Sequence, residues 1–300
     1  RLEDALASYG AAIALKPDYA EAFNNRGLAL QELNRLDDAL SSYDKAIALK
    51  PDYADAFYNR GNTLKELERL VDAVASYDKA IALNPDYAEA FYNRGSALQD
   101  LKRLDDALSS YAKAIALKPD FEFLQGTKLY TQMRICDWSN LQSQLNGLVA
   151  SIAEERKVTF PFPVLSLADR PDLQLKASRI YANEKYPDPR VWREFNTRPA
   201  DGKIRIGYYS ADFHNHATSF LMAELFEAHD PQKFELYGFS FGPNKQDEMR
   251  SRVSSSFKQF FDVTKKSDRE VAQMSRELGI DIAVDLKGAT QDSRMGIFAE

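Results

Sequence analysis

Apolar residues recur at helical spacing along the first 120 residues, and the whole pattern repeats every 34 residues. The segment YAEAFNNRGLALQELNRLDDALSSYDKAIALKPD begins at Tyr19, and closely similar segments begin at Tyr53 and Tyr87. The first 18 residues match the second half of the same unit. A unit of this length holds two amphipathic helices, neither of which buries its apolar face until units stack. We therefore predict an α-helical solenoid over residues 1–120, with one half repeat and three complete repeats.

Each unit carries the same small, aromatic and proline positions. Small residues suit the close approach of two helices, aromatic residues fill the space between successive hairpins, and proline separates one unit from the next. Together with the period, these positions resemble the tetratricopeptide (TPR) repeat. The set comprises Phe23, Phe57 and Phe91; Gly27, Gly61 and Gly95; Ala39, Ala73 and Ala107; Tyr43, Tyr77 and Tyr111; and Pro51, Pro85 and Pro119.

One periodic position is not explained by packing. Asn25, Asn59 and Asn93 recur on the first helix of each complete repeat, the helix that lines the concave groove of a TPR solenoid. An amide side chain both donates and accepts hydrogen bonds, so it can pair with a peptide backbone of any sequence. Two interpretations stay open, a peptide-binding ladder and a polar filler of TPR helices.

The repeat marks end after residue 120, and residues 121–200 form a predicted helical connector. Five prolines between residues 159 and 189 punctuate its second half around one amphipathic helix, predicted from Asp172 to Asn183. We predict that Cys136 and Trp138 pack in the core, because they occur among apolar helical residues. The boundary to the next domain is predicted between Arg198 and Gly202.

From Lys203 the pattern changes to alternating strands and helices. This order predicts a doubly wound, parallel, Rossmann-like α/β lobe over residues 201–300. The first strand is not followed by GxGxxG, so the dinucleotide-binding fingerprint is absent. Strands are predicted at residues 203–210, 234–241, 259–263 and 281–286, and helices at residues 218–228, 246–257 and 268–278.

Two of the three histidines, His214 and His216, occur in the loop that follows the first strand. Ligands of open α/β sheets bind at the carboxyl ends of strands, so this loop is a candidate site. Loop polarity is the simpler interpretation of both residues, and a His-x-His metal pair lacks further Cys or His to complete it. His229 ends a predicted helix, where it can interact with the helix dipole.

Composition narrows the classes of partner. The formal charge of -6 argues against a general nucleic-acid or anionic-membrane surface, so we expect neither partner. Cys136 is the only cysteine, which excludes an intrachain disulfide and indicates a reducing, cytoplasmic location. No apolar run is long enough for a membrane helix.

Three motifs in order resemble one enzyme family. RIGYYSADFHNHATSFLMAELFEAHD, FELYGFSFGP and GIDIAVDLKGATQDSRMGIFA, preceded by TPR repeats with recurrent Asn, are similar to the protein O-GlcNAc transferases. The resemblance covers the whole chain. It implies a GT-B glycosyltransferase that transfers GlcNAc from UDP-GlcNAc, with inversion, to Ser or Thr of proteins. It further implies protein or peptide substrates in the TPR groove, a sugar nucleotide donor, no cofactor and no metal.

The resemblance also assigns site residues. His216 matches the histidine of the family's D-F-x-x-H pattern, a proposed general base, and Asp212 in the same loop could orient it. Lys287, Gly288 and Thr290 match a loop that faces the donor cleft. The chain departs from the family at two further positions of this segment, Ala289 in place of Tyr and Met295 in place of Pro.

The chain begins at Arg1 within a repeat and ends at Glu300 shortly after a predicted strand, so we expect an amino-terminal fragment. A second lobe with most UDP contacts is then missing, and the fragment alone is expected to be inactive. Two alternatives stay open. One is a peptide O-fucosyltransferase-like enzyme that uses another sugar nucleotide, and the other is a non-catalytic TPR protein-binding adaptor.

Overall fold

The computed structural model describes residues 1–186, 202–288, 290 and 293–299. The chain divides into two compact units, Arg1–Ser178 and Arg179–Glu300. The domain limits expected from the sequence stay a prediction, since most of the boundary at 198–202 lies outside the described residues. No helix in the described part of the chain has both the length and the apolar character needed to cross a membrane.

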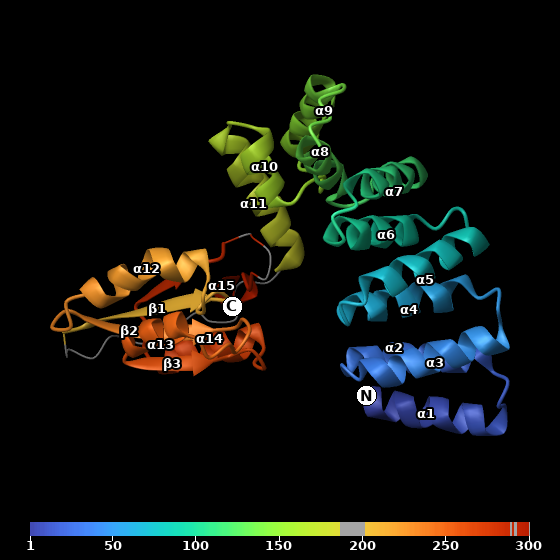
Figure 1. Cartoon of the computed structure of the whole chain (residues 1–300), viewed down its shortest axis with the longest axis horizontal. Coiled ribbons are helices and arrows are strands. Elements are labelled where there is room, and N and C mark those ends of the chain that lie inside the picture. Colours follow the sequence, from blue (N-terminus) through green and yellow to red (C-terminus); the bar gives the residue numbers. More distant parts are fainter. Residues whose placement is uncertain (187–201, 289, 291–292, 300) are drawn as a thin grey trace. The chain divides into compact units, whose positions relative to one another are not determined.

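Seven helices of similar length form the first part of the amino-terminal unit (Figure 1). They pack as successive antiparallel pairs, with α2 against α3, α4 against α5 and α6 against α7. This arrangement confirms the predicted TPR solenoid. The helices are α1 (Leu2–Leu15), α2 (Ala20–Glu32), α3 (Leu36–Leu49), α4 (Ala54–Glu66), α5 (Leu70–Leu83), α6 (Ala88–Asp100) and α7 (Leu104–Leu117).

The repeated glycine lies where the two helices of a pair come closest. A Cβ atom on Gly61 would lie 2.6 Å from the ring of Tyr77, and Gly27 and Gly95 meet the tyrosine of their own repeat in the same way. Tyr77 is fully buried, so its ring has no free space to move into. Glycine is therefore required here for close packing and not for its backbone freedom.

A recurrent arginine joins neighbouring pairs. Arg60 on α4 donates to Asp44 of the preceding α3 at 2.6 Å and to Ser76 of the following α5 at 2.7 Å. Arg94 makes the equivalent bonds to Asp78 and Ser110, both at 2.6 Å. The equivalent of Asp44 in the third complete repeat is Ala112, and no TPR arginine follows it.

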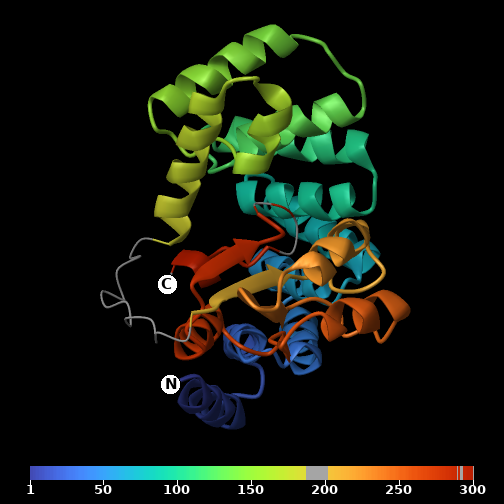
Figure 2. The same ribbon diagram turned by 90° about the vertical axis from the view of Figure 1, so that its left-hand side faces the viewer.

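Helices α8, α9 and α10 extend the stack beyond α7 (Figure 2), and α11 follows them in the chain. Helix α8 packs on α7, and both α9 and α10 pack on α8. Helix α10 was not expected, because Pro161 and Pro163 suggested a loop; proline is tolerated in the first turn of a helix, where its missing N–H has no intrahelical partner. The bounds are α8 (Leu124–Arg134), α9 (Leu141–Ala153), α10 (Pro161–Leu167) and α11 (Pro171–Lys185).

The prediction that Cys136 and Trp138 pack in the core is wrong. Cys136 is exposed and has a φ of 58°, and Trp138 is 54% exposed. Helix α8 ends at Arg134, so both residues lie in the turn before α9. Helical periodicity predicts burial only for residues inside a helix, which explains the error.

The second unit contains a four-stranded parallel sheet in the order β3-β2-β1-β4. Strand β1 (Ile204–Ser210) lies in the middle, next to β2 (Phe234–Ser240) and β4 (Ile282–Asp285), and β3 (Gln259–Asp262) is at an edge. In the register of the sheet, Ile206 of β1 lies opposite Leu236 of β2 and opposite Ile282 of β4. The carboxyl ends of β1 and β4 are consequently neighbours.

Helices cover both faces of this sheet, which confirms the doubly wound lobe. Helices α12 (Ala217–Ala228) and α13 (Glu248–Ser255) pack on the face that carries Ile206 and Tyr208. Helices α14 (Asp268–Glu277) and α15 (Gly296–Ala299) pack on the face that carries Tyr209 and Phe239. Successive residues of one strand thus enter opposite cores, as expected for a buried parallel sheet.

Candidate active site

The loop after β1 is held by bonds to its own backbone. The N–H of Asp212 donates to the hydroxyl of Ser210 at 3.0 Å, and the hydroxyl of Ser219 donates to the carbonyl of Asp212 at 2.6 Å. Asp212 is only 8% exposed. The residue at the centre of the loop is therefore fixed between the end of β1 and the start of α12.

Asp212 pairs with a residue from the neighbouring strand. Lys287, two residues beyond β4, places its Nζ atom 3.2 Å from Oδ1 and 3.1 Å from Oδ2 of Asp212. Both side chains are about nine-tenths buried. A buried ion pair of this kind is stable only while both partners are present, so it connects the two loops.

Lys287 begins a tight turn. Its N–H donates to Asp285 at 2.9 Å, and its carbonyl accepts the hydroxyl of Thr290 at 2.7 Å. Gly288 between them has a φ of 54°, a left-handed conformation that glycine adopts without strain. The three residues predicted to form the donor-cleft loop thus lie together in one turn, and Lys287 joins this turn to Asp212; Ala289 lies outside the described residues.

His216 caps helix α12. Its backbone is extended (φ -145°, ψ 150°), and its Nδ1 atom lies 3.2 Å from the N–H of Thr218 and 3.2 Å from the hydroxyl of the same residue. A side-chain acceptor at this position satisfies one of the free N–H groups of the first helical turn. The imidazole is partly exposed, with 44% of the side chain accessible.

Two neutral tautomers of His216 have different chemistry. If Nδ1 accepts the Thr218 N–H, the ring proton is on Nε2, and the exposed nitrogen can only donate. If Nδ1 carries the proton, it can donate to the Thr218 hydroxyl, and Nε2 then has a free lone pair. Only the second tautomer can take a proton from a hydroxyl at Nε2.

The hydroxyl of Thr218 lies between His216 and Asp212. It donates to Oδ2 of Asp212 at 3.4 Å, whereas His216 Nδ1 is 3.6 Å from the same oxygen, beyond normal hydrogen-bond length. Asp212 can therefore reach the imidazole through Thr218. The sequence pattern placed Thr218 only at a helix start, and nothing in it indicated this bridging position.

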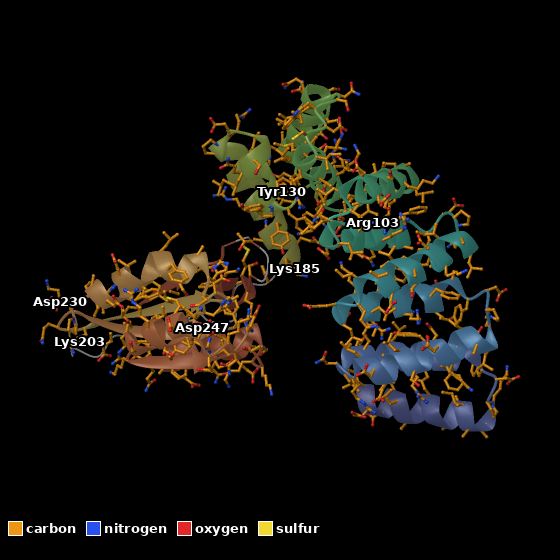
Figure 3. The ribbon with its side chains drawn as sticks, in the orientation of Figure 1. Arg103, Tyr130, Lys185, Lys203, Asp230 and Asp247 are labelled. Atoms are coloured by element: carbon orange, nitrogen blue, oxygen red, sulfur yellow. The ribbon has the colours of Figure 1, made fainter. Side chains whose placement is uncertain are left out.

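Asp247, labelled in Figure 3, is the N-cap of α13 and accepts a hydrogen bond from the histidine loop. Its carboxylate accepts the N–H of Asn215 and the N–H of Arg250, each at 2.9 Å. These two backbone bonds, led by that of Asn215, hold the pKa of Asp247 below its usual range. The residue between the two histidines is thus anchored to a second helix.

The buried side chain of Arg250 also forms a hydrogen bond with this loop. It is 6% exposed, and its guanidinium donates to the carbonyl of Phe213 and to the hydroxyl of Ser240, both at 3.1 Å. The guanidinium also lies 5.1 Å from the centre of the Phe260 ring, a favourable cation–π distance. An arginine in an amphipathic helix normally indicates the solvent face, which is why the sequence did not reveal this position.

The loops after β1 and β2 touch. A Cβ atom on Gly242 would lie 1.8 Å from the carbonyl oxygen of Ala211, so only glycine fits there.

His214 lies on the same loop as His216, with their ring centres 5.8 Å apart. No group of three or more His, Cys, Asp or Glu side chains suited to a metal ion occurs within residues 1–186, 202–288, 290 and 293–299.

The remaining histidine lies away from this site. His229 is the C-cap of α12, and its Nδ1 donates to the carbonyl of Leu225 at 2.6 Å, consistent with the expected role at the helix end. Lys203 and Asp230, which precede β1 and β2, mark this amino-terminal edge of the sheet in Figure 3. Parallel strands place it opposite the loop of His216.

Two of the three candidate asparagines of the TPR unit, Asn59 and Asn93, link neighbouring helices. Asn59 donates to Asn24 of the preceding repeat at 3.0 Å, and Asn93 donates to Tyr58 at 3.0 Å. Asn25 is exposed, and the other two are half-buried. Among the described residues, the Oδ1 atoms of Asn59 and Asn93 accept no hydrogen bond, which leaves them available to a ligand.

The two parts of the chain match different families of known proteins. Residues 178–300 match Glycosyl transferase family 41, and residues 1–34, 29–68, 61–102 and 88–121 match tetratricopeptide repeats. The chain is similar to the probable UDP-N-acetylglucosamine-peptide N-acetylglucosaminyltransferase SEC of Arabidopsis thaliana, 31% identical over 186 residues that make up 57% of this chain and 19% of that protein. It is 30% identical to the UDP-N-acetylglucosamine-peptide N-acetylglucosaminyltransferase of Caenorhabditis elegans over 181 residues, 55% of this chain and 16% of that protein.

One solved structure shares the fold over most of the chain. A mutant O-GlcNAc transferase of Thermobaculum terrenum aligns with a TM-score of 0.50 and 20% sequence identity, covering 88% of this chain and 45% of that one. The chain thus spans less than a fifth of the two curated relatives and about half of the solved structure. It carries tetratricopeptide repeats followed by a glycosyl transferase family 41 domain, and over these parts it is homologous to O-GlcNAc transferases.

Proposed function

We propose that this chain is part of a protein O-GlcNAc transferase, which transfers GlcNAc from UDP-GlcNAc to Ser or Thr hydroxyls of proteins with inversion at the anomeric carbon. The observation that carries the proposal is the cluster of Asp212, Thr218, His216 and Lys287 at the carboxyl ends of β1 and β4, within the residues that match family 41. This is the end of an open α/β sheet where ligands bind.

In the proposed reaction, the acceptor oxygen bonds to the anomeric carbon while the bond from that carbon to UDP breaks. The diphosphate leaves with the electron pair, and the hydroxyl proton passes to Nε2 of His216. This transfer uses the tautomer in which Nδ1–H donates to Thr218 and Thr218 donates to Asp212. Lys287 keeps Asp212 in place, and Gly288 and Thr290 shape the neighbouring loop for the donor.

The TPR unit supplies the protein-binding part of the proposal. Asn25, Asn59 and Asn93 lie on the first helices of successive repeats, and a peptide backbone could pair with their amides. No cofactor or metal is proposed for this chain, in line with what the resemblance to the family implies. The single, exposed cysteine suits a reducing compartment, so the proposed substrates are cytoplasmic proteins.

The test is transfer of labelled sugar to protein acceptors by the full-length polypeptide that the gene encodes. UDP-GlcNAc and GDP-fucose are offered as competing donors, and His216→Ala is compared with His214→Ala. We expect GlcNAc transfer that His216→Ala reduces by about 10²-fold or more and that His214→Ala largely preserves. Transfer of fucose would overturn the assignment of UDP-GlcNAc as donor. Peptide binding without any sugar transfer would overturn the enzyme and favour the non-catalytic TPR adaptor.

A further inference from the structure

A small cavity lies on the face of the TPR unit formed by the first helices of the repeats. Its volume is about 370 Å³, and it is bounded by α2, α4 and α6 together with one buried tyrosine of α5. Side chains with hydrogen-bonding groups surround it throughout. They are Gln31, Asn62, Lys65, Glu66, Tyr77 and Asn93.

Lys65 is the cation of this cavity, and it lacks a counterion. The side chain is half-buried, and its ammonium donates to the hydroxyl of Ser96 at 2.6 Å. No carboxylate of the described residues lies within 4.0 Å of it, and its two other N–H donors have no protein partner there. Burial lowers the pKa of Lys65, and the charge of Asp100 only partly opposes this effect.

The charge at this position is specific to one repeat. The equivalent residues in the preceding and following repeats are Gln31 and Gln99, which are neutral amides. The neighbouring repeats pack with an uncharged glutamine at this position and avoid the cost of desolvating a charge, so the packing of a repeat does not require lysine here. A half-buried ammonium without a counterion is suited to an anion from outside the chain.

Asn62 provides a second donor beside the lysine. Its Oδ1 accepts the hydroxyl of Tyr77 at 2.8 Å and the amide of Asn93 at 2.9 Å. Its Nδ2 has no partner among the described residues. One carboxylate needs at least two donors, and Lys65 and Asn62 together supply them.

Acidic residues limit the site to a single anion. Glu66 lines the same cavity, where it accepts the amide of Gln31 at 2.5 Å, and Asp100 acts on Lys65 from the next repeat. A second negative charge on the ligand would meet these carboxylates. A run of acidic residues should therefore bind no better than one.

We propose that Lys65 and Asn62 form a subsite for one Asp or Glu side chain of a peptide that lies along the TPR groove. The inference rests on the proposed role of the TPR unit in binding protein substrates, and it adds a preference among them. Substrates with one acidic residue at the register of Lys65 are selected over neutral ones.

The test measures affinity for the intact chain by fluorescence anisotropy. The probe is a neutral, labelled peptide of about ten residues, long enough to cross three adjacent helices. One Glu is moved through its positions, with Gln at the same place as the reference. At one register we expect Glu to bind about tenfold tighter than Gln, the effect of a charge-assisted hydrogen bond. Two adjacent Glu residues should give no further gain.

Lys65→Gln introduces the residue that the neighbouring repeats carry, so it should not disturb the fold. It is expected to bring the Glu-to-Gln ratio to about one while leaving the affinity for the neutral peptide unchanged. Lys79→Gln is the matched control, since it removes the same charge from an exposed position on α5. This variant should keep the tenfold preference.

The outcomes distinguish failure of the proposed Lys65 subsite from failure of peptide binding in the TPR groove. Neutral peptides that bind with no preference for Glu, or with a preference that survives Lys65→Gln, overturn the subsite and leave the groove intact. Loss of neutral-peptide binding in Asn59→Ala/Asn93→Ala supports the groove independently of Lys65. If no peptide binds at all, both the groove and its subsite are wrong.

Discussion

The ammonium of Lys287 lies 3.1 Å from the carboxylate of Asp212, although 75 residues separate the two in sequence. They meet because β1 and β4 are neighbours in the sheet and both run in the same direction. The pair thus joins the loop that carries His216 to the loop that begins at Lys287. A change at either residue is expected to affect both loops.

Replacing Lys287 with Met should destabilise the α/β unit by about 3 kcal/mol, because it leaves the Asp212 carboxylate buried without a counterion. Chemical denaturation followed by circular dichroism measures this loss. The double variant Asp212→Asn/Lys287→Met removes both charges and should recover most of it. Arg252→Met is the control, since it breaks an exposed pair with Glu227 and should cost less than about 1 kcal/mol.

Thr218→Val removes the hydroxyl between His216 and Asp212 while keeping the shape of the side chain. In the full-length enzyme we expect kcat to fall about tenfold with little change in KM, because the tautomer with a free Nε2 loses its hydrogen-bond acceptor. Thr218→Ser keeps a hydroxyl and should retain most activity. Equal loss in both variants would show that the hydroxyl is not what matters.

His216 also stabilises helix α12, and this role can be separated from catalysis. In the tautomer whose Nδ1 accepts the Thr218 N–H, His216 caps the helix, so His216→Ala should lower the free energy of unfolding by about 1 kcal/mol. His216→Asn supplies a good N-cap and should restore stability without restoring transfer. An Asn variant as active as the wild type would exclude His216 as the base.

The sequence predicts most of the fold because its elements are defined locally. The strand expected at 234–241 is observed as Phe234–Ser240, and the helix expected at 268–278 as Asp268–Glu277. Each is a buried apolar run or an amphipathic segment bounded by polar residues and turns, so short-range pattern is sufficient. The seven-residue helix at Pro161 was missed because its first-turn prolines indicate a break when the helix start is unknown.

The surroundings of the site depend on contacts that no local pattern contains. Asp212 and His216 could be placed in one loop from the sequence, but the pairing of Asp212 with Lys287 follows from the order of the strands. Arg250 and Asp247 have ordinary helical and N-capping sequences, and only the packing of α13 beside the loop gives them a role there. Their contacts follow from tertiary packing.

The close contact between Gly61 and Tyr77 predicts that Gly61→Ala is destabilising by about 1–2 kcal/mol. The added methyl group would overlap the buried ring, and this cost exceeds the gain in helix propensity. Gly10→Ala is the matched control, because a Cβ atom there has nothing within 4 Å and the residue lies inside α1. Thermal unfolding should show a lower Tm for the first variant and an unchanged or higher Tm for the second.

Tyr209 should make the α/β unit sensitive to alkaline pH. Burial raises the pKa of Tyr209 to about 12, and the hydroxyl of Ser275, at 2.6 Å, lowers it only in part. The unfolded tyrosine ionises near pH 10, so the unfolded state binds fewer protons between pH 10 and pH 12. The contribution of this group is complete below pH 10 and is lost as the pH rises to about 12, by roughly 2–3 kcal/mol for a two-unit shift.

Tyr209→Phe tests this directly. The variant loses about 1 kcal/mol at pH 8 with the bond to Ser275, but its unfolding free energy should then fall less steeply than that of the wild type between pH 10 and pH 12. Urea unfolding at several pH values gives both numbers. Tyr19→Phe, which removes a partly exposed tyrosine of the amino-terminal unit, is the control for loss of a hydroxyl outside the α/β unit. Parallel curves for Tyr209→Phe and the wild type would mean that another group causes the alkaline loss.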